Sequence, residues 1–277
     1  MGLIQSASNL FGGALAPIIA IGLAVSLGWR EAFYITAVPA FIMGLILMKY
    51  LRKPMMKTDI ALQETKHKPT KKEFMGIFGR RNIWLGMIIA ISNMLFIIGI
   101  STFFPLILAN MSGFGDGING LLLGLMGFMF FVGQAVVPAI SDRIGRKPFL
   151  AVSTLIAIFL PVAIYFFYDN FTLLLISLII FALGNGYQPL ALAIIPAESV
   201  PPMLAASAMA ALFLVAELIG GSLGPFVSGV LADQFGLPAS MWLPMIGAAI
   251  AFLCSFGIQE TAPAKIAKTS NDQGIAF

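Results

Sequence analysis

The chain has very few of the residues on which enzymes and soluble domains usually depend. Only 10% of its 277 residues are charged, whereas soluble domains carry about 25%. It has one histidine, His67, and one cysteine, Cys254, so neither an intrachain disulfide nor a metal site is expected. It also lacks the phosphate-binding pattern G-x-x-x-x-G-K-[ST] and the zinc-protease pattern H-E-x-x-H. These absences argue against a soluble domain, a nucleotide-driven pump and an enzyme, and no cofactor is predicted.

Apolar residues make up 59% of the chain, and they are gathered in long runs. A membrane-spanning helix needs about 20 mostly apolar residues. Eight such runs occupy residues 3–27, 32–50, 83–110, 118–140, 149–168, 171–195, 203–231 and 240–258. They are continuous rather than alternating, which favours helices over a barrel. The sequence therefore predicts an all-α membrane protein with eight transmembrane helices.

The distribution of positive charge predicts how the helices are oriented. Ten of the sixteen lysines and arginines lie between the second and third runs, from Lys49 to Arg81. Arg143, Arg146 and Lys147 follow the fourth run, and Lys265 and Lys268 follow the last. With eight spans these places share one side, and such an excess of positive charge marks the cytoplasmic side. Both termini and the basic linker at 52–81 are therefore expected in the cytoplasm, and nothing suggests nucleic-acid binding.

An internal repeat links the two ends of the chain. Residues 12–28, GGALAPIIAIGLAVSLG, resemble residues 220–236, GGSLGPFVSGVLADQFG, at a constant offset of 208. Small residues and prolines at such places allow close helix packing and kinks. The residues expected to have this packing role are Gly12, Gly13, Pro17, Gly220, Gly221, Gly224 and Pro225.

The offset carries the first span onto the seventh, so the repeating unit contains six helices. Transporters built from parallel repeats of this kind are known. The chain is then expected to hold the last two helices of a first unit and all six of a second, and to be truncated at its N-terminus. The expected organisation is two helices at 1–51, the linker at 52–81, a six-helix half at 82–262 and a cytoplasmic tail at 263–277.

A charged motif follows the fourth run, in the stretch PAISDRIGRKPF. With the six-plus-six arrangement and the basic linker, it resembles the major facilitator superfamily of transporters, whose loops between helices 2 and 3 and between helices 8 and 9 carry G-x-x-x-D-R-x-G-R-[RK]. The matching residues are Asp142, Arg143, Gly145, Arg146 and Lys147, while Pro138 replaces the leading glycine. The stretch GWREAFYI, residues 28–35, is similar to the link between helices 5 and 6 of many members.

The resemblance implies that this motif is a cytoplasmic gate or latch. A carboxylate at Asp142 can face the positive N-terminal end of a neighbouring helix, and Arg143 and Arg146 can pair with carboxylates. Gly145 would permit a tight turn. By pseudo-symmetry the latch is expected to meet the chain around Met1. An antiporter pattern in helix 5 is incomplete, because Ala16 replaces the glycine before Pro17.

Glu217 is the only charged residue deep within any predicted span. Ionisable groups inside a membrane are costly and usually functional, so Glu217 is a candidate for proton coupling or cation contact. A protonated carboxyl bonded to nearby backbone is the alternative. Asn9 occupies the equivalent position in the repeat.

Polar residues in other spans are candidates for substrate contact. The stretch GNGYQP, residues 184–189, interrupts a span with two glycines and a proline, and broken spans can offer free polar groups to a substrate. Asn185, Tyr187 and Gln188 supply these groups, and Asn93 and Gln134 lie within other spans. Hydrogen bonding between helices is the alternative for all five. Glu198, at a cytoplasmic helix end, is expected to have a capping or gating role.

These observations together predict a secondary transporter for a small solute, a metabolite or an organic ion, working by alternating access with proton or other ion coupling. The rival interpretations are a truncated fragment without transport activity and a drug/proton antiporter. The expected partners are membrane lipid, the substrate and a coupling ion. The full-length protein is expected to be a monomer in the bacterial inner membrane.

Overall fold

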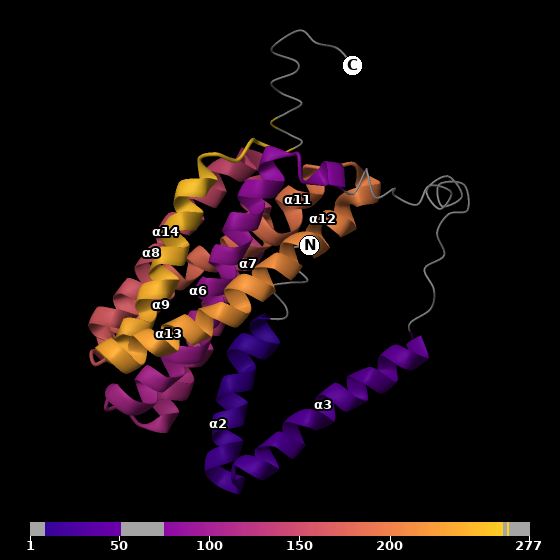
Figure 1. Ribbon diagram of the computed structural model, residues 1–277. Coiled ribbons are helices and arrows are strands. Elements are labelled where there is room, and N and C mark those ends of the chain that lie inside the picture. The colour runs from indigo at the N-terminus through magenta and orange to yellow at the C-terminus, as the bar shows by residue number, and fades with distance from the viewer. Residues whose placement is uncertain (1–8, 51–74, 263–264, 266–277) are drawn as a thin grey trace.

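The computed structural model describes residues 9–50, 75–262 and 265. This part of the chain is almost entirely helical and contains no strand (Figure 1). In chain order its helices are η1 (Asn9–Leu15), α2 (Ala16–Leu27), α3 (Trp29–Tyr50), α6 (Arg81–Met111), α7 (Asp116–Ile144), α8 (Arg146–Phe167), α9 (Phe171–Phe181), η2 (Ala182–Gly186), α10 (Tyr187–Pro189), η3 (Leu190–Ile194), α11 (Ile195–Glu198), α12 (Pro202–Val215), η4 (Ala216–Gly221), α13 (Ser222–Phe235), η5 (Leu237–Met241) and α14 (Trp242–Ser255).

Seven of the eight predicted spans are helices long and apolar enough to cross a membrane. They are Trp29–Tyr50, Arg81–Met111, Asp116–Ile144, Arg146–Phe167, Phe171–Glu198, Pro202–Phe235 and Leu237–Ser255. The remaining span is helical from residue 9 to residue 27, and residues 3–8 lie outside the described part. Both ends of each of these seven helices lie within little more than one helical turn of the bounds predicted for the apolar run. The prediction of an all-α membrane bundle is confirmed.

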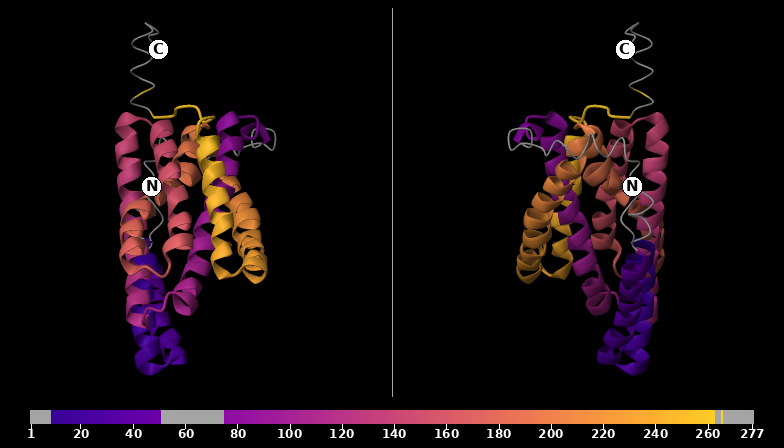
Figure 2. Two further views of the ribbon diagram at one scale, coloured as in Figure 1. Left: turned by 90° about the vertical axis from the view of Figure 1, so that its left-hand side faces the viewer. Right: turned by 90° about the vertical axis from the view of Figure 1, so that its right-hand side faces the viewer.

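The six spans from α6 to α14 pack around α6 and α8. Helix α6 lies against α14, α12 and η4, while α8 lies against α14, α9 and η2 (Figures 1 and 2). Large side chains at the centre, including Phe96, Phe104 and Tyr187, are completely buried. In a membrane such helices associate through close packing and hydrogen bonds rather than by expelling water.

Helices α2 and α3 relate very differently to this bundle. Helix α2, with η1 before it, lies along α7, whereas α3 packs on α2 and points away from the bundle (Figure 1). The outward side chains of α3 are large and apolar, among them Phe33, Phe41 and Met48. This composition suits contact with lipid or with another apolar helix.

The two copies of the sequence repeat share unusual backbone geometry. Gly28 ends α2 with φ 101° and ψ 158°, and its counterpart Gly236 ends α13 with φ 91° and ψ 156°. The π-helical segment η1 corresponds to residues 217–223, which overlap the π-helical segment η4. Because π-helical turns are rare and often mark functional places, their coincidence supports the repeat.

Some of the predicted segments fall largely outside the described residues. Of the linker at 52–81, only 75–81 are described, with a helical turn at 75–77 and Arg81 as the first residue of α6. Of the tail at 263–277, only Lys265 is described. Met1, where the latch was expected to dock, lies outside the described residues, and the packing expected of Gly13 and Pro17 is not described either.

Candidate transport site

A single glycine joins α7 to α8 and places Arg146 at the start of α8. Gly145 has φ +128° and ψ 149°, a conformation that residues with a side chain rarely adopt. A Cβ atom at this position would also lie 2.5 Å from Oε2 of Glu260. The predicted tight turn is present, and it requires glycine for both its backbone and its space.

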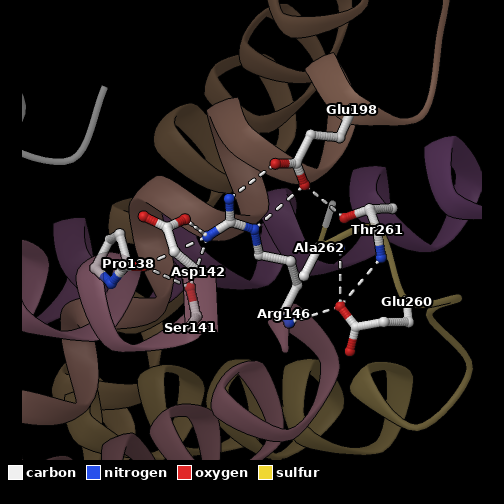
Figure 3. Close-up of polar contacts among 8 residues, drawn as sticks. All are labelled: Pro138, Ser141, Asp142, Arg146, Glu198, Glu260, Thr261 and Ala262. Carbon is white, nitrogen blue, oxygen red and sulfur yellow. Dashed lines mark hydrogen bonds and ion pairs between the residues drawn. The ribbon is translucent and has the colours of Figure 1, made fainter. Parts of the chain in front are cut away.

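The guanidinium of Arg146 is bound by polar groups from two segments, the end of α7 and α11 (Figure 3). Its Nε and Nη2 donate to the Glu198 carboxylate at 3.2 and 2.8 Å, a two-pronged contact. Its Nη1 pairs with Asp142 and donates to Oγ of Ser141 at 2.8 Å. The Arg146 side chain is only 6% exposed, so its guanidinium is sheltered from water, whereas the Asp142 carboxylate remains largely exposed. We call Asp142, Arg146, Glu198, Glu260 and Thr261 the Arg146 cluster.

Pro138 stands where the family motif has glycine, and its backbone fits the cluster. Its carbonyl oxygen accepts hydrogen bonds from Oγ of Ser141 at 2.8 Å and from Nη1 of Arg146 at 3.4 Å. Only the backbone oxygen of residue 138 is used, so the departure from glycine leaves these contacts in place.

Glu260 caps the N-terminus of α8 from the segment that follows α14 (Figure 3). Its carboxylate accepts from the backbone amides of Arg146 at 2.7 Å, Lys147 at 3.3 Å, Thr261 at 3.1 Å and Ala262 at 3.0 Å. Partial burial disfavours the charged form, but the amides of Ala262, Arg146 and Lys147 and the charge of Lys265 hold the pKa of Glu260 below its usual range. The carboxylate that caps this helix end is thus Glu260, while Asp142 pairs with the side chain of Arg146, the first residue of α8.

The pKa of Glu260 predicts how the cluster responds to acid. A carboxyl with a lowered pKa stabilises the folded state above its unfolded pKa of about 4.3, and this stabilisation is lost as pH falls through the folded value. We expect the thermal stability of the detergent-solubilised protein to stay level between about pH 5 and 7 and to fall below about pH 4. Glu260→Gln should be less stable near neutral pH and should show a smaller loss in acid. An equal loss in both proteins would contradict this role.

The other residues of the motif differ from Arg146. The side chain of Arg143 is exposed, and neither it nor the side chain of Lys147 has an ion pair or a hydrogen bond within the described part of the chain. Thr261, which sequence reasoning missed, donates from Oγ1 to Glu198 at 2.7 Å and so ties the segment after α14 to α11. Glu260 was missed too, although a carboxylate directly after the last span of a carboxylate-poor chain was a usable signal.

Five predicted substrate residues come together inside the α6–α14 bundle. Gln134 of α7 donates through Nε2 to Oε1 of Gln188, and Asn185 donates to the same oxygen at 3.4 Å. The Tyr187 ring packs against Phe96 of α6, and the Asn93 side chain of α6 lies near the Tyr187 hydroxyl without forming a hydrogen bond with it. All five are buried, and we call them the buried polar cluster.

Several atoms of the buried polar cluster have no hydrogen-bond partner. They are Nδ2 and Oδ1 of Asn93, Oδ1 of Asn185 and the Tyr187 hydroxyl, all fully buried. Buried polar groups are nearly always hydrogen-bonded, and leaving one unbonded costs about 1–3 kcal/mol. These atoms therefore suit a bound molecule that carries both donors and acceptors, or ordered water.

Two glycines, Gly184 and Gly186, let the span Phe171–Glu198 pack closely against α7 and α8. The backbone of η2 is 3₁₀-helical, which agrees with the predicted interruption. A Cβ atom at Gly184 would lie 2.7 Å from Cα of Ala157 in α8, and one at Gly186 would lie 2.8 Å from the carbonyl carbon of Gly133 in α7. The glycines thus allow direct backbone contact with both helices and position Asn185 between them.

Glu217 lies apart from the buried polar cluster. It is exposed on the π-helical segment η4, midway along the span Pro202–Phe235. A Cβ atom at Gly221 would lie 2.6 Å from Glu217 Oε2, so the carboxylate folds back along its own helix. Ser222 donates from Oγ to the Glu217 backbone oxygen at 3.3 Å. No ion pair or hydrogen bond joins the Glu217 carboxylate to another described residue.

The predicted packing glycines of η4 and α13 lie against α6. A Cβ atom at Gly220 would meet the backbone oxygen of Ile91 at 2.5 Å, and one at Gly224 would lie 3.2 Å from a methyl group of Leu95. Gly12 has no neighbour within 4 Å of a Cβ atom, so the first copy of the repeat does not show this contact.

Residues 220–224 also spell G-x-S-x-G, the pattern of a serine-hydrolase elbow. That elbow is a strained turn from a strand into a helix. Here the five residues lie within the continuous helical run of η4 and α13, so the pattern reflects helix packing. Among the described residues no group of three or more histidine, cysteine, aspartate and glutamate side chains is placed to hold a metal.

Comparison with known proteins agrees with these features. The Major Facilitator Superfamily model matches residues 1–221 and again residues 120–274. An MFS-type efflux pump of Mycolicibacterium smegmatis is 26% identical over 244 residues, covering 83% of this chain and 53% of that protein. The glycine betaine/proline/ectoine/pipecolic acid transporter OusA of Dickeya dadantii is 26% identical over 253 residues, covering 85% and 49%.

The chain spans about half the length of these curated relatives. Its apolar helices make it an integral, multi-pass membrane protein. The extent of the family match, together with the motif around Arg146 and the helical bundle, shows that the chain belongs to the Major Facilitator Superfamily.

Proposed function

We propose that the protein carries out secondary transport of a small polar solute by alternating access. The observation that carries this proposal is the set of unpartnered, fully buried polar atoms on Asn93, Asn185 and Tyr187. They come from two different spans and lie at the centre of the bundle. A solute with hydroxyl, amide or similar groups would satisfy them, whereas pairing between helices already accounts for Gln134 and Gln188.

In this proposal residues 82–262 form the second six-helix half of the transporter, and residues 9–50 supply the last two helices of the first half. The Arg146 end of the bundle faces the cytoplasm, as the concentration of lysine and arginine suggests. All residues of the Arg146 cluster belong to this second half, so the cluster fixes its helix ends against one another and thereby shapes the side of the proposed cytoplasmic latch that would meet the first half.

Glu217 is the proposed coupling residue. Its carboxylate lies midway along an apolar span and has no ion pair with a described residue, so its charge is costly in lipid. Taking up a proton would remove this cost when the residue faces an apolar environment. Transport driven by a proton gradient would follow from such a cycle.

The test uses the purified chain in proteoliposomes with an imposed pH gradient. The probes for uptake are labelled glycine betaine and proline, which the name of one relative gives. The probe for efflux is ethidium, a fluorescent lipophilic cation chosen because the other relative is named an efflux pump. The expected result is gradient-dependent movement of at least one probe, reduced at least about tenfold by Glu217→Gln. Glu31→Gln, which changes an exposed carboxylate at the start of α3, is the matched control and should retain coupling.

Two results would contradict these assignments. Full gradient dependence in Glu217→Gln would remove Glu217 from the coupling mechanism. Failure of the wild-type chain to move any of the three probes would favour the interpretation that it does not transport by itself. Ethidium movement alone would favour drug/proton antiport, the second candidate, to which the relative named an efflux pump points.

A further inference from the structure

Asn82, in the first turn of α6, binds two segments that are distant in sequence. Its Nδ2 donates to Oγ of Ser199 at 3.1 Å and to the backbone oxygen of Gln259 at 3.2 Å. Its Oδ1 accepts from the backbone amide of Gln259 at 2.9 Å. The residue is 6% exposed, so both ends of the amide group are used in a sheltered place. Since none of these bonds goes to α6 itself, Asn82 does more than cap its own helix.

The partners of Asn82 are the immediate neighbours of the carboxylates that hold α8. Ser199 follows Glu198, and Gln259 precedes Glu260. The Glu198 carboxylate accepts hydrogen bonds from the Arg146 guanidinium, and the Glu260 carboxylate accepts hydrogen bonds from the backbone amides at the N-terminus of α8. Each dipeptide is therefore held on one side by α6 and on the other by α8. Thr261 joins the two dipeptides through its bond to Glu198.

We propose that Asn82 is a positioning residue that acts through this pair of dipeptides on the Arg146 cluster. By fixing Ser199 and Gln259 it sets the places of the Glu198 and Glu260 carboxylates, although it contacts neither carboxylate. It also connects the cluster mechanically to α6, the helix that carries Asn93 three turns further along. Under the proposed transport function, on which only this last consequence rests, a displacement of the Arg146 cluster would be passed to α6 and so to one wall of the buried polar cluster.

The backbone amides of Arg146 and Lys147 offer a direct way to measure this effect. The first amides of a helix have no acceptor within the helix, so their protection from hydrogen exchange depends on an external partner. Here that partner is the Glu260 carboxylate. Their exchange rates therefore report the position of Glu260 without a label or an added probe.

The experiment compares hydrogen–deuterium exchange of wild-type and Asn82→Ala proteins in lipid nanodiscs. Losing three hydrogen bonds should raise exchange at the amides of Arg146 and Lys147 on the order of tenfold, although Asn82 touches neither residue. The matched control is Asn110→Ala at the opposite end of α6, where the side chain bonds only to Leu106 of its own helix. It should leave these amides unchanged.

A purely local role for Asn82 predicts a different pattern. Exchange would then rise at the Gln259 amide, which loses its acceptor, while the amides of Arg146 and Lys147 would keep wild-type rates. That result would overturn the proposal. If Asn82→Ala does not fold, Ser199→Ala removes one of the three bonds while the Gln259 amide keeps its acceptor. Faster exchange at the amides of Arg146 and Lys147 would then support the proposal, and wild-type rates at these amides would overturn it. Because no transport is measured, a protein that moves no solute still tests this coupling.

Discussion

A Gly186→Ala protein is expected to melt at least about 5 °C below the wild-type protein. The added methyl group would meet the backbone of Gly133 and would lie 2.5 Å from a methyl group of Val137. Overpacking usually costs about 1–3 kcal/mol, and a clash with backbone lies at or above the upper end because a helix must move. In a protein of this size about 3 kcal/mol corresponds to about 5 °C. Thermal unfolding of the detergent-solubilised protein, monitored by size-exclusion chromatography, measures the change in melting temperature.

Gly229→Ala provides the matched control for this change. It also adds one methyl group to a glycine in a membrane helix, but the nearest atom, Cζ of Phe103, would be 3.9 Å away in ordinary contact. Its melting temperature should stay within about 2 °C of wild type. If the two variants had the same melting temperature, the direct backbone contact between η2 and α7 would not be the reason for glycine at residue 186.

Arg146→Ala is expected to cost about 2–3 kcal/mol of stability and to disable the proposed latch. Breaking a buried ion pair by removing one partner typically costs about 3–5 kcal/mol, and the value is reduced here because the Glu198 and Asp142 side chains are 22% and 60% exposed. Arg146→Lys should not restore the loss, since an ammonium group lacks the planar fork that binds Glu198 with two nitrogens. Thermal unfolding measures the stability of both variants.

Two comparisons isolate the contribution of the Arg146 cluster. Arg143→Ala removes an equal charge from an exposed neighbour and should change stability by less than about 0.5 kcal/mol. A double-mutant cycle with Glu198→Ala should be clearly less than additive, because each single change already breaks the same pair. Additive losses would show that Arg146 and Glu198 stabilise the protein independently.

The sequence predicted the fold class because long apolar runs leave few alternatives in a membrane. The π-helical turns at η1, η3 and η4 were not predicted, since a single inserted residue in a helix leaves no compositional signal. The same limitation explains why Asn93, Gln134 and Asn185 were each identified as candidates without evidence that they meet. Their meeting depends on the 3₁₀ register of η2 and on glycine contacts with α7 and α8.

The Arg146 cluster was predicted only in its local part. The motif from Asp142 to Lys147 is contiguous and identified Gly145 and Arg146, but Glu198 and Glu260 lie 52 and 114 residues beyond Arg146. Such partners depend on how the helices pack, which one sequence does not reveal. For the same reason Asn82 was not recognised, because its partners are 117 and 177 residues away.

The distant origin of Glu260 has a consequence for the order in which the protein is made. Ribosomes add about 5–20 residues per second, so the 114 residues that separate Arg146 from Glu260 take on the order of ten seconds to synthesise. During that interval the first amides of α8 lack their carboxylate, and Asp142, only four residues from Arg146, is the one cluster carboxylate already made before it. The cluster is therefore complete only after the last span has been inserted. This end of the bundle is the last to close during biosynthesis.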